Sequence, residues 1–126
     1  MATETPIEIV RRFCAAWSNA SPDELAEFFT DDAVYHNIPI APVTGRDTIK
    51  ATIAGFTGGV EKIEFRVHHI VADGNVVLTE RTDVFHAGDR TIELPVMGTF
   101  EVKDGKIAAW RDYFDMKQFM DQMAGG

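Results

Sequence analysis

The segment that most constrains the fold runs from Lys106 to Asp115 and follows the dipeptide Asp104-Gly105. Asp-Gly between alternating segments is a strong signal for a two-residue β-hairpin, so we predict that this segment is the last strand of a sheet. Side chains alternate between the faces of a strand, which places Asp112 on the same face as Trp110 and Phe114. Burying a carboxylate between two aromatic side chains is costly without a partner. Either this face is wet, or another residue donates hydrogen bonds to Asp112.

The first half of the chain carries signals for helices. Residues 5–8 form a capping box with proline at the first helical position, and the helix is predicted to reach about Ser18. Residues 21–24 form a second capping box of the same kind, which predicts a short second helix. Its apolar stripe is Leu25, Phe28 and Phe29. A third helix is predicted over 45–56. Between the second and third helices, a brief strand is predicted over 34–38, which places Tyr35 and Asn37 on one face.

From Val60 onward the apolar pattern has a period of two. Strands are predicted to end at residues 73, 86 and 103. The apolar face of the first is predicted to be Ile63, Phe65, Val67, His69 and Val71. The second strand has no cleanly apolar face, so the pattern does not say which face is buried. The third has the inward face Ile92, Leu94, Val96, Phe100 and Val102, and Pro95 predicts a bulge or an edge there.

Helices that precede antiparallel strands indicate an α+β fold with helices on one side of a sheet. A final helix is predicted after Asp115, which we expect to be its cap. The 126 residues are enough for one domain, 1–126, with a core and one pocket. A strongly curved sheet closed by helices on its concave side would enclose a deep apolar pocket, the usual place for a small-molecule site.

Composition and charge argue against several kinds of binding partner and structural site. The net charge of −8 argues against nucleic acid and against anionic membrane surfaces as partners. The single cysteine, Cys14, excludes a disulfide framework, and it lies on an apolar helical stripe, where an inert core residue is expected. The start of the chain has no signal-peptide pattern, so we expect a cytoplasmic protein. The histidines (His36, His68, His69 and His86) have no metal-binding spacing, so we predict no metal site.

The predicted donor for Asp112 is Arg81, which shares a strand face with Asp83. A guanidinium has five donors and can hold a carboxylate on each side. In such a unit arginine keeps one carboxylate ionised, while low dielectric and repulsion raise the apparent pKa of the other. One unit could thus supply a general base and a general acid near neutral pH. Taken alone, however, Arg-x-Asp on a strand is often a solvated cross-strand ion pair.

Tyr35 and Asn37 add a hydroxyl and an amide that could fix a water molecule. No histidine is predicted beside a nucleophile with a third residue to orient it. The pattern therefore favours water activation without a nucleophilic side chain.

Three segments also resemble the limonene-1,2-epoxide hydrolases: Tyr35-x-Asn37-x-Pro39, Glu80-Arg81-x-Asp83-Val84 and residues 110–115. Residues 45–47 and 104–107 fall in register between them, so the resemblance covers nearly the whole chain. It implies a curved mixed sheet, a cone-shaped pocket, a homodimer, no cofactor, and attack of water on a small hydrophobic epoxide.

Carried over by position, the resemblance makes Asp112 the base, Asp83 the acid and Arg81 the bridge, while Tyr35 and Asn37 help to hold the water. It also implies an apolar, substrate-binding wall of bulky residues. These positions are Cys14, Trp17, Phe56, Phe85, Leu94, Val96, Phe114 and Phe119.

Two alternatives remain open from the sequence. One is an isomerase or cyclase of the ketosteroid-isomerase or polyketide-cyclase type, in which a lone aspartate abstracts a carbon-bound proton. A bridging arginine fits this chemistry less well. The other is a non-catalytic module that binds an apolar ligand, which would not need five converging polar groups.

Overall fold

The computed structural model of the chain describes residues 4–125. Within these residues one six-stranded sheet has the order β2-β1-β6-β5-β4-β3. Strands β1 and β6 run parallel and the other neighbouring strands are antiparallel, so the sheet is mixed. In chain order the elements are α1 (Pro6–Ala16), α2 (Pro22–Ala26), β1 (Phe29–Asn37), β2 (Val43–Thr44), α3 (Arg46–Thr57), β3 (Lys62–Asp73), β4 (Val76–Ala87), β5 (Arg90–Lys103), β6 (Lys106–Tyr113) and α4 (Met116–Met123).

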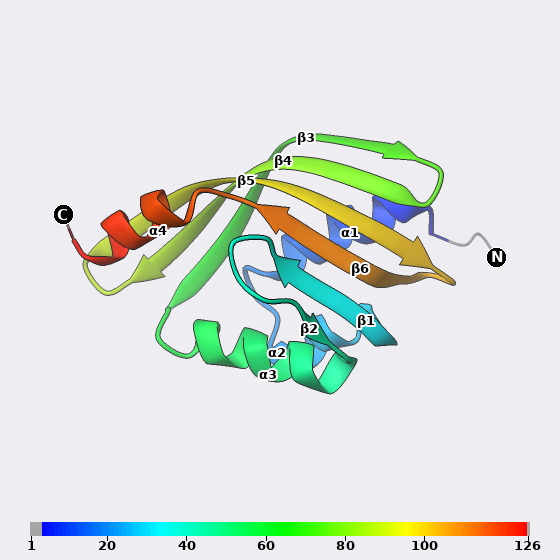
Figure 1. Cartoon of the computed structure of the whole chain (residues 1–126), viewed down its shortest axis with the longest axis horizontal. Coiled ribbons are helices and arrows are strands. Elements are labelled where there is room, and N and C mark those ends of the chain that lie inside the picture. Colours follow the sequence, from blue (N-terminus) through cyan, green and yellow to red (C-terminus); the bar gives the residue numbers. More distant parts are fainter. Residues whose placement is uncertain (1–3, 126) are drawn as a thin grey trace.

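The sheet arches over three helices, as Figure 1 shows, and α4 lies at one end of the arch. Helix α1 packs against β3 and β4, and α3 packs against β1 and α2. The core between α1 and the sheet is aromatic: Phe13 contacts Phe29, Phe100 and Trp110 edge-on. This arrangement confirms the predicted α+β fold with a curved mixed sheet and helices on its concave side.

The predicted helix starts are confirmed by their caps. In α1 the Thr5 hydroxyl accepts from the amide of Glu8, and the Glu8 carboxylate accepts from the amide of Thr5. Ser21 and Glu24 repeat this exchange in α2. The second helix is shorter than its apolar stripe predicted, because Phe29 is already the first residue of β1.

Strand β1 begins five residues before the predicted start at Val34. Its early part pairs with β6, with a register shift between Phe29 and Val34. Asp31 and Asp32 are exposed there, so this part lacks the apolar alternation that predicts a strand. Pairing with a strand distant in sequence outweighs the weak local preference.

The predicted apolar face of β3 is wrong beyond Val67. The pairing of β3 with β4 shifts register between Val67 and His69, as at a β-bulge. An extra residue reverses the faces of everything that follows it. Val71 is therefore 60% exposed, and Ile70 packs against the core in its place.

The structure shows which face of β4 is buried. Thr79, Arg81 and Asp83 point to the concave side together, and all three are almost completely buried. The inward face predicted for β5 is confirmed. Pro95 is opposed by Thr82 of β4, whereas the pairing of β5 with β6 begins only at Met97. Pro95 thus lies where β5 has a free side, which agrees with the predicted edge position.

The turn before β6 has positive φ at both Asp104 (51°) and Gly105 (81°), as a two-residue hairpin turn of this kind requires. Beyond β6, Asp115 caps α4 by accepting from the amides of Lys117 and Gln118, as predicted. No helix within residues 4–125 is long and apolar enough to span a membrane.

Candidate active site

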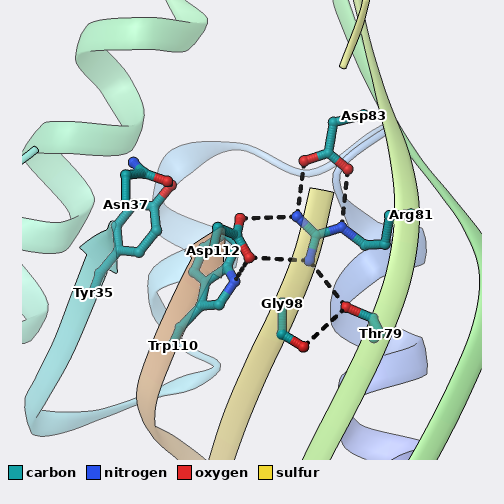
Figure 2. A network of polar contacts seen from close by, with 8 residues as sticks. All are labelled: Tyr35, Asn37, Thr79, Arg81, Asp83, Gly98, Trp110 and Asp112. Carbon is teal, nitrogen blue, oxygen red and sulfur yellow. Dashed lines mark hydrogen bonds and ion pairs between the residues drawn. The ribbon is translucent and has the colours of Figure 1, made fainter. Parts of the chain in front are cut away.

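The buried polar side chains in the described part of the chain gather in one place on the concave face. They are Thr79, Arg81 and Asp83 from β4 and Asp112 from β6. Strand β5 lies between these two strands, so the cluster extends across β5. Figure 2 shows Arg81 between the two carboxylates.

Arg81 uses all five of its N–H groups. Nε donates to Asp83 Oδ1 at 2.9 Å and Nη2 donates to Asp83 Oδ2 at 2.8 Å. On the other side Nη2 donates to Asp112 Oδ2 at 2.8 Å and Nη1 to Asp112 Oδ1 at 3.2 Å. The last N–H of Nη1 is taken by Thr79 Oγ1 at 3.2 Å. The predicted hydrogen bonds from Arg81 to Asp112 are therefore present, and the carboxylates form two bidentate pairs with one cation.

The flat face of the guanidinium is covered as well. Arg81 Cζ lies 4.5 Å from the centre of the Phe65 ring, within range of a cation–π interaction. Phe65 in turn stacks on Trp17, with ring centres 4.6 Å apart. Hydrogen bonds at its edge and an aromatic ring on its face hold Arg81 in one orientation.

Asp112 has a third donor, Trp110. Trp110 Nε1 donates to Asp112 Oδ1 at 2.7 Å, from two residues earlier on the same strand. The indole is fully buried and stacks on Tyr35, with ring centres 4.2 Å apart. Asp112 thus accepts three hydrogen bonds, whereas Asp83 accepts two.

Tyr35 and Asn37 lie on β1, beside the strand that carries Asp112. The register of the parallel pair sets Tyr35 opposite Trp110 and Asn37 opposite Asp112. Asn37 Nδ2 donates to the Tyr35 hydroxyl at 3.0 Å, and the hydroxyl lies 3.2 Å from Asn37 Oδ1. Figure 2 shows this pair on the side of Asp112 away from Arg81. The five predicted polar site residues therefore come together in space.

For both Arg81 and Asp83, burial and the opposite charge of the partner shift the pKa in opposite directions. Burial raises the pKa of Asp83 to about 6 from its usual 3.8, with Asp112 adding to the rise and Arg81 opposing it. Burial alone would lower the pKa of Arg81, but the two carboxylates hold it well above its ordinary value. Burial also raises the pKa of Tyr35 far above its usual range, so its hydroxyl stays protonated. The cluster can thus hold one protonated carboxyl group near neutral pH beside a permanent cation.

The cluster opens onto a cavity of about 460 Å³. Four polar residues line it: Tyr35, Asn37, Asp83 and Asp112. The remaining wall is apolar and comes from α3, β3, β4, β5, α4 and the segments between elements. It consists of Ile40, Gly55, Phe56, Gly59, Val60, Phe65, Phe85, Ala87, Ile92, Leu94, Val96, Phe114, Met116, Phe119 and Met123.

Six of the eight predicted wall residues line this cavity: Phe56, Phe85, Leu94, Val96, Phe114 and Phe119. The structure places the other two, Cys14 and Trp17, in the core instead. Trp17 supports the wall from behind, because it stacks on Phe65 and Phe56. Burial raises the pKa of the Cys14 thiol to about 12, which leaves it protonated and unreactive.

The sequence reasoning missed two polar groups of the cluster. One is the indole N–H of Trp110, although Trp110 was correctly placed on the face of Asp112. The other is the Thr79 hydroxyl. Each lies two residues before a predicted site residue on the same strand, so the period-two rule that joined Arg81 to Asp83 also reaches them. Met116 and Met123 also escaped prediction as wall residues, because their helical stripe is equally typical of packing.

The histidines do not join this site. His68 Nε2 lies 2.7 Å from the Thr82 hydroxyl, and His86 Nε2 lies 3.3 Å from a Glu64 carboxylate oxygen, both outside the cluster. Across residues 4–125, no group of three histidine, cysteine or acidic residues is placed to hold a metal ion.

Comparison with known proteins agrees with this geometry. Residues 4–125 match the model of the limonene-1,2-epoxide hydrolase catalytic domain. The chain is 38% identical to the epoxide hydrolase EphG of Mycobacterium tuberculosis over 107 residues, which is 85% of this chain and 71% of EphG. A solved structure of an M. tuberculosis LEH-like epoxide hydrolase superposes with a TM-score of 0.84 at 36% identity, covering 96% of this chain and 90% of that one.

A more distant structure shares the fold alone. It is a protein with a ketosteroid isomerase-like fold from Catenulispora acidiphila, with a TM-score of 0.83 at 23% identity, covering 96% of this chain and 95% of that one. The family match spans nearly all of the chain, and the curated relative exceeds a third identity. The chain therefore belongs to the limonene-1,2-epoxide hydrolase family of enzymes.

Proposed function

We propose that this enzyme adds water to a hydrophobic epoxide in a single step and releases a vicinal diol. Asp112 acts as the base, Asp83 as the acid, and Arg81 holds both. The observation that carries this proposal is the buried arginine that grips two carboxylates with unequal hydrogen bonding at the wall of an apolar cavity.

The base is assigned to Asp112 because it accepts one more hydrogen bond than Asp83 and lies beside Tyr35 and Asn37. A carboxylate offers about four acceptor positions, and three of those on Asp112 are filled by Arg81 and Trp110. One position is left to accept a proton from water. Tyr35 and Asn37, one strand away, supply a hydroxyl and an amide to hold that water.

The acid is assigned to Asp83 because burial raises its pKa to about 6. In its protonated form Asp83 donates an O–H to the epoxide oxygen while the water oxygen attacks a ring carbon. One carbon–oxygen bond forms and one breaks, a proton moves from water to Asp112, and another moves from Asp83 to the oxygen that leaves the carbon. The product is the neutral diol, and one proton must then return to Asp83.

Arg81 keeps the electrostatic environment of the two carboxylates nearly constant while they exchange protonation states. Before the step Asp112 is ionised and Asp83 is protonated; after it the two have changed places. Because Arg81 makes a bidentate contact with each, it stabilises whichever carboxylate carries the charge. The charge of the three-residue unit does not change, so little reorganisation is needed during the reaction.

The substrate is proposed to be an epoxide with no other polar group that needs recognition. All four polar residues on the wall belong to the proposed reaction site, and the rest of the wall is apolar. The relatives named as epoxide hydrolases support the epoxide as the reacting group.

The test has two parts. Purified enzyme is first assayed for diol formation with terpene, cyclic and aryl epoxides. One turnover with enzyme in excess is then run in water enriched in ¹⁸O. Direct attack places the label in the diol, whereas a covalent ester route delivers an unlabelled carboxylate oxygen first. Unlabelled diol would overturn the single-step mechanism. Binding of the epoxides without conversion would favour the non-catalytic module, and rearranged products without added water would favour an isomerase.

We also infer that the enzyme forms a homodimer through the convex face of the sheet. Val71, Leu78, Met97 and Tyr113 are exposed on that face. The strand register places Val71 beside Leu78 and Met97 beside Tyr113, with Thr99 opposite Leu78 and Glu80 opposite Met97, so two apolar pairs lie near each other on this face. A second copy of the chain is the partner that the family resemblance implies. Light scattering should give the mass of a dimer for the wild type and of a monomer for Met97→Lys. A wild-type monomer would refute the proposal.

A further inference from the structure

The position of Arg81 depends on a row of residues that crosses the sheet beneath it. Thr79 of β4 is opposed by Gly98 of β5, and Gly98 is opposed by Asp112 of β6. To reach Asp112, the Arg81 side chain must cross β5, and it does so over Gly98 (Figure 2).

Gly98 leaves the space that this crossing requires. A Cβ atom at this position would lie 2.4 Å from Arg81 Nη1, 2.6 Å from Asp112 Oδ1 and 3.0 Å from Thr79 Oγ1. Gly98 is not among the glycines with positive φ, so the reason for glycine here is space and not backbone conformation. Any side chain at residue 98 would push the cation and the carboxylate out of their hydrogen-bonding positions.

Thr79 supplies the fifth acceptor for the guanidinium. Its side chain is buried, and its hydroxyl lies 3.4 Å from the Gly98 carbonyl oxygen, to which it donates. That bond turns a lone pair of Oγ1 toward Arg81 Nη1, which donates to it at 3.2 Å. The guanidinium is thereby shared between three groups, with two hydrogen bonds to each carboxylate and one to the hydroxyl.

We propose that Thr79 and Gly98 are positioning residues that form a seat for Arg81 and so fix how it is shared between Asp83 and Asp112. This inference rests on the proposed function, because the sharing matters to the reaction only if the two carboxylates exchange protons with substrate and water. Without the hydroxyl, one buried N–H of Arg81 has no partner, and the guanidinium must turn to find one. Any turn lengthens hydrogen bonds to one or both carboxylates.

The decisive variants are Thr79→Val and Thr79→Ser. Valine has nearly the shape of threonine and suits a strand, but it removes the acceptor, whereas serine keeps it. We expect Thr79→Val to lose on the order of 10- to 100-fold in kcat, the scale expected for slight misplacement of a catalytic group, with KM little changed. Thr79→Ser should recover most of the turnover. Thr82→Val is the matched control, since Thr82 lies on the same strand and faces away from the site.

A second readout does not depend on turnover. Because Arg81 holds down the pKa of Asp83 against burial, a loosened Arg81 should let the Asp83 carboxyl titrate at higher pH in Thr79→Val. Carbon-13 NMR of the Asp83 side chain measures this, and Thr79→Ser and Thr82→Val should titrate like the wild type. Gly98→Ala should produce the same loss of turnover with Thr79 untouched.

These measurements separate the two proposals. Wild-type kcat and an unshifted Asp83 titration in Thr79→Val would overturn the seat, as would equal losses in the valine and serine variants. Full turnover in Gly98→Ala would also overturn it. If the wild type converts no epoxide while the Asp83 titration moves in Thr79→Val alone, the seat is supported and the proposed function fails.

Discussion

The two ends of the cavity are built differently. At the inner end, Arg81, Asp83 and Asp112 stand on central strands, their side chains are at most 6% exposed, and all five donors of Arg81 are paired. We call the part of the wall formed by Met116, Phe119 and Met123 of α4 the mouth, because these residues are at least partly exposed and the helix has no buried residue. The inner end is therefore fixed by many mutual contacts, whereas the mouth is not.

A few polar contacts hold the mouth in place. Gln122 Oε1 accepts from the backbone amide of Glu93, and Gln122 Nε2 donates to the backbone carbonyl of Glu93, each at 2.9 Å. Arg90 donates to the carbonyl of Met123. Phe119 of α4 also meets Phe85 of β4 edge-on. The contrast implies that changes at the inner end abolish the chemistry, while changes at the mouth alter which molecules are accepted.

The largest effect is expected from removing either carboxylate at the inner end. Asp112→Asn and Asp83→Asn should each lower kcat by about 10²- to 10⁴-fold, the usual range for positioned proton transfer. Asparagine has the same shape, so the fold should be retained and circular dichroism should be unchanged. Either variant with near-wild-type turnover on a good epoxide would show that its assigned role is wrong.

Arg81→Lys should be the next most damaging change, although it keeps the charge. An ammonium cannot make two bidentate contacts, so Asp83 and Asp112 would lose most of their hydrogen bonds. We expect a large loss of kcat, together with a loss of about 1–3 kcal/mol in the free energy of unfolding from unsatisfied buried groups. Urea unfolding and steady-state kinetics measure the two effects. An active and equally stable lysine variant would refute the bridge.

The contrast also explains what the sequence could predict. The pairing of Arg81 with Asp112 was predictable because a buried carboxylate needs a donor, and because residues two apart on a strand share a face. These rules are local and apply wherever strands are regular. The core position of Trp17 was not predictable in this way, because an aromatic residue on a helical stripe can face either a cavity or a neighbouring ring.

Two features of the fold could not be predicted from the sequence because they depend on how a strand pairs with its neighbour in the sheet. The early start of β1 depends on its parallel neighbour β6, which is more than seventy residues away in the chain. The bulge between Val67 and His69 reversed the faces of β3 without any glycine or proline to signal it. Both depend on the partner strand and not on the segment itself.

The pH dependence tests whether Asp83 is the acid. Its carboxyl accepts two hydrogen bonds from Arg81 and feels the charge of Asp112, and burial raises its pKa to about 6. A general acid must be protonated, so kcat should fall about tenfold per pH unit above about pH 6. A flat profile up to about pH 8 in the wild type would exclude Asp83 as the acid.

Protonation of Asp83 should also make the stability of the fold depend on pH, in a direction that its pKa defines. The folded-state pKa of Asp83 lies above its usual 3.8, so the folded protein binds more protons between these values. The contribution of Asp83 to stability is thus complete below the usual value and is lost as the pH rises through about 6. Urea unfolding across this window should show the loss in the wild type, and Asp83→Asn should remove that part of the pH dependence.

The smallest effect is expected at the mouth, from Gln122→Ala. This change removes both hydrogen bonds between α4 and Glu93, and Gln122 itself does not line the cavity. Since the side chain is only partly buried, we expect a cost of about 1 kcal/mol, which corresponds to roughly fivefold in an equilibrium constant. Because Phe119 and Met123 would be less firmly held, the change should appear in KM for bulky epoxides that reach the mouth. Small epoxides that fill only the inner end should keep their kcat and KM.

Gln118→Ala is the matched control, because Gln118 is an exposed glutamine on the same helix and its side chain makes no hydrogen bond within residues 4–125. The ratio of kcat/KM between a bulky and a small epoxide should shift in Gln122→Ala and stay constant in Gln118→Ala. Equal ratios in both variants would mean that the Gln122 contact does not hold the mouth. A uniform loss of kcat on every substrate would mean that α4 supports the inner end as well, and the two ends of the cavity would then not be independent.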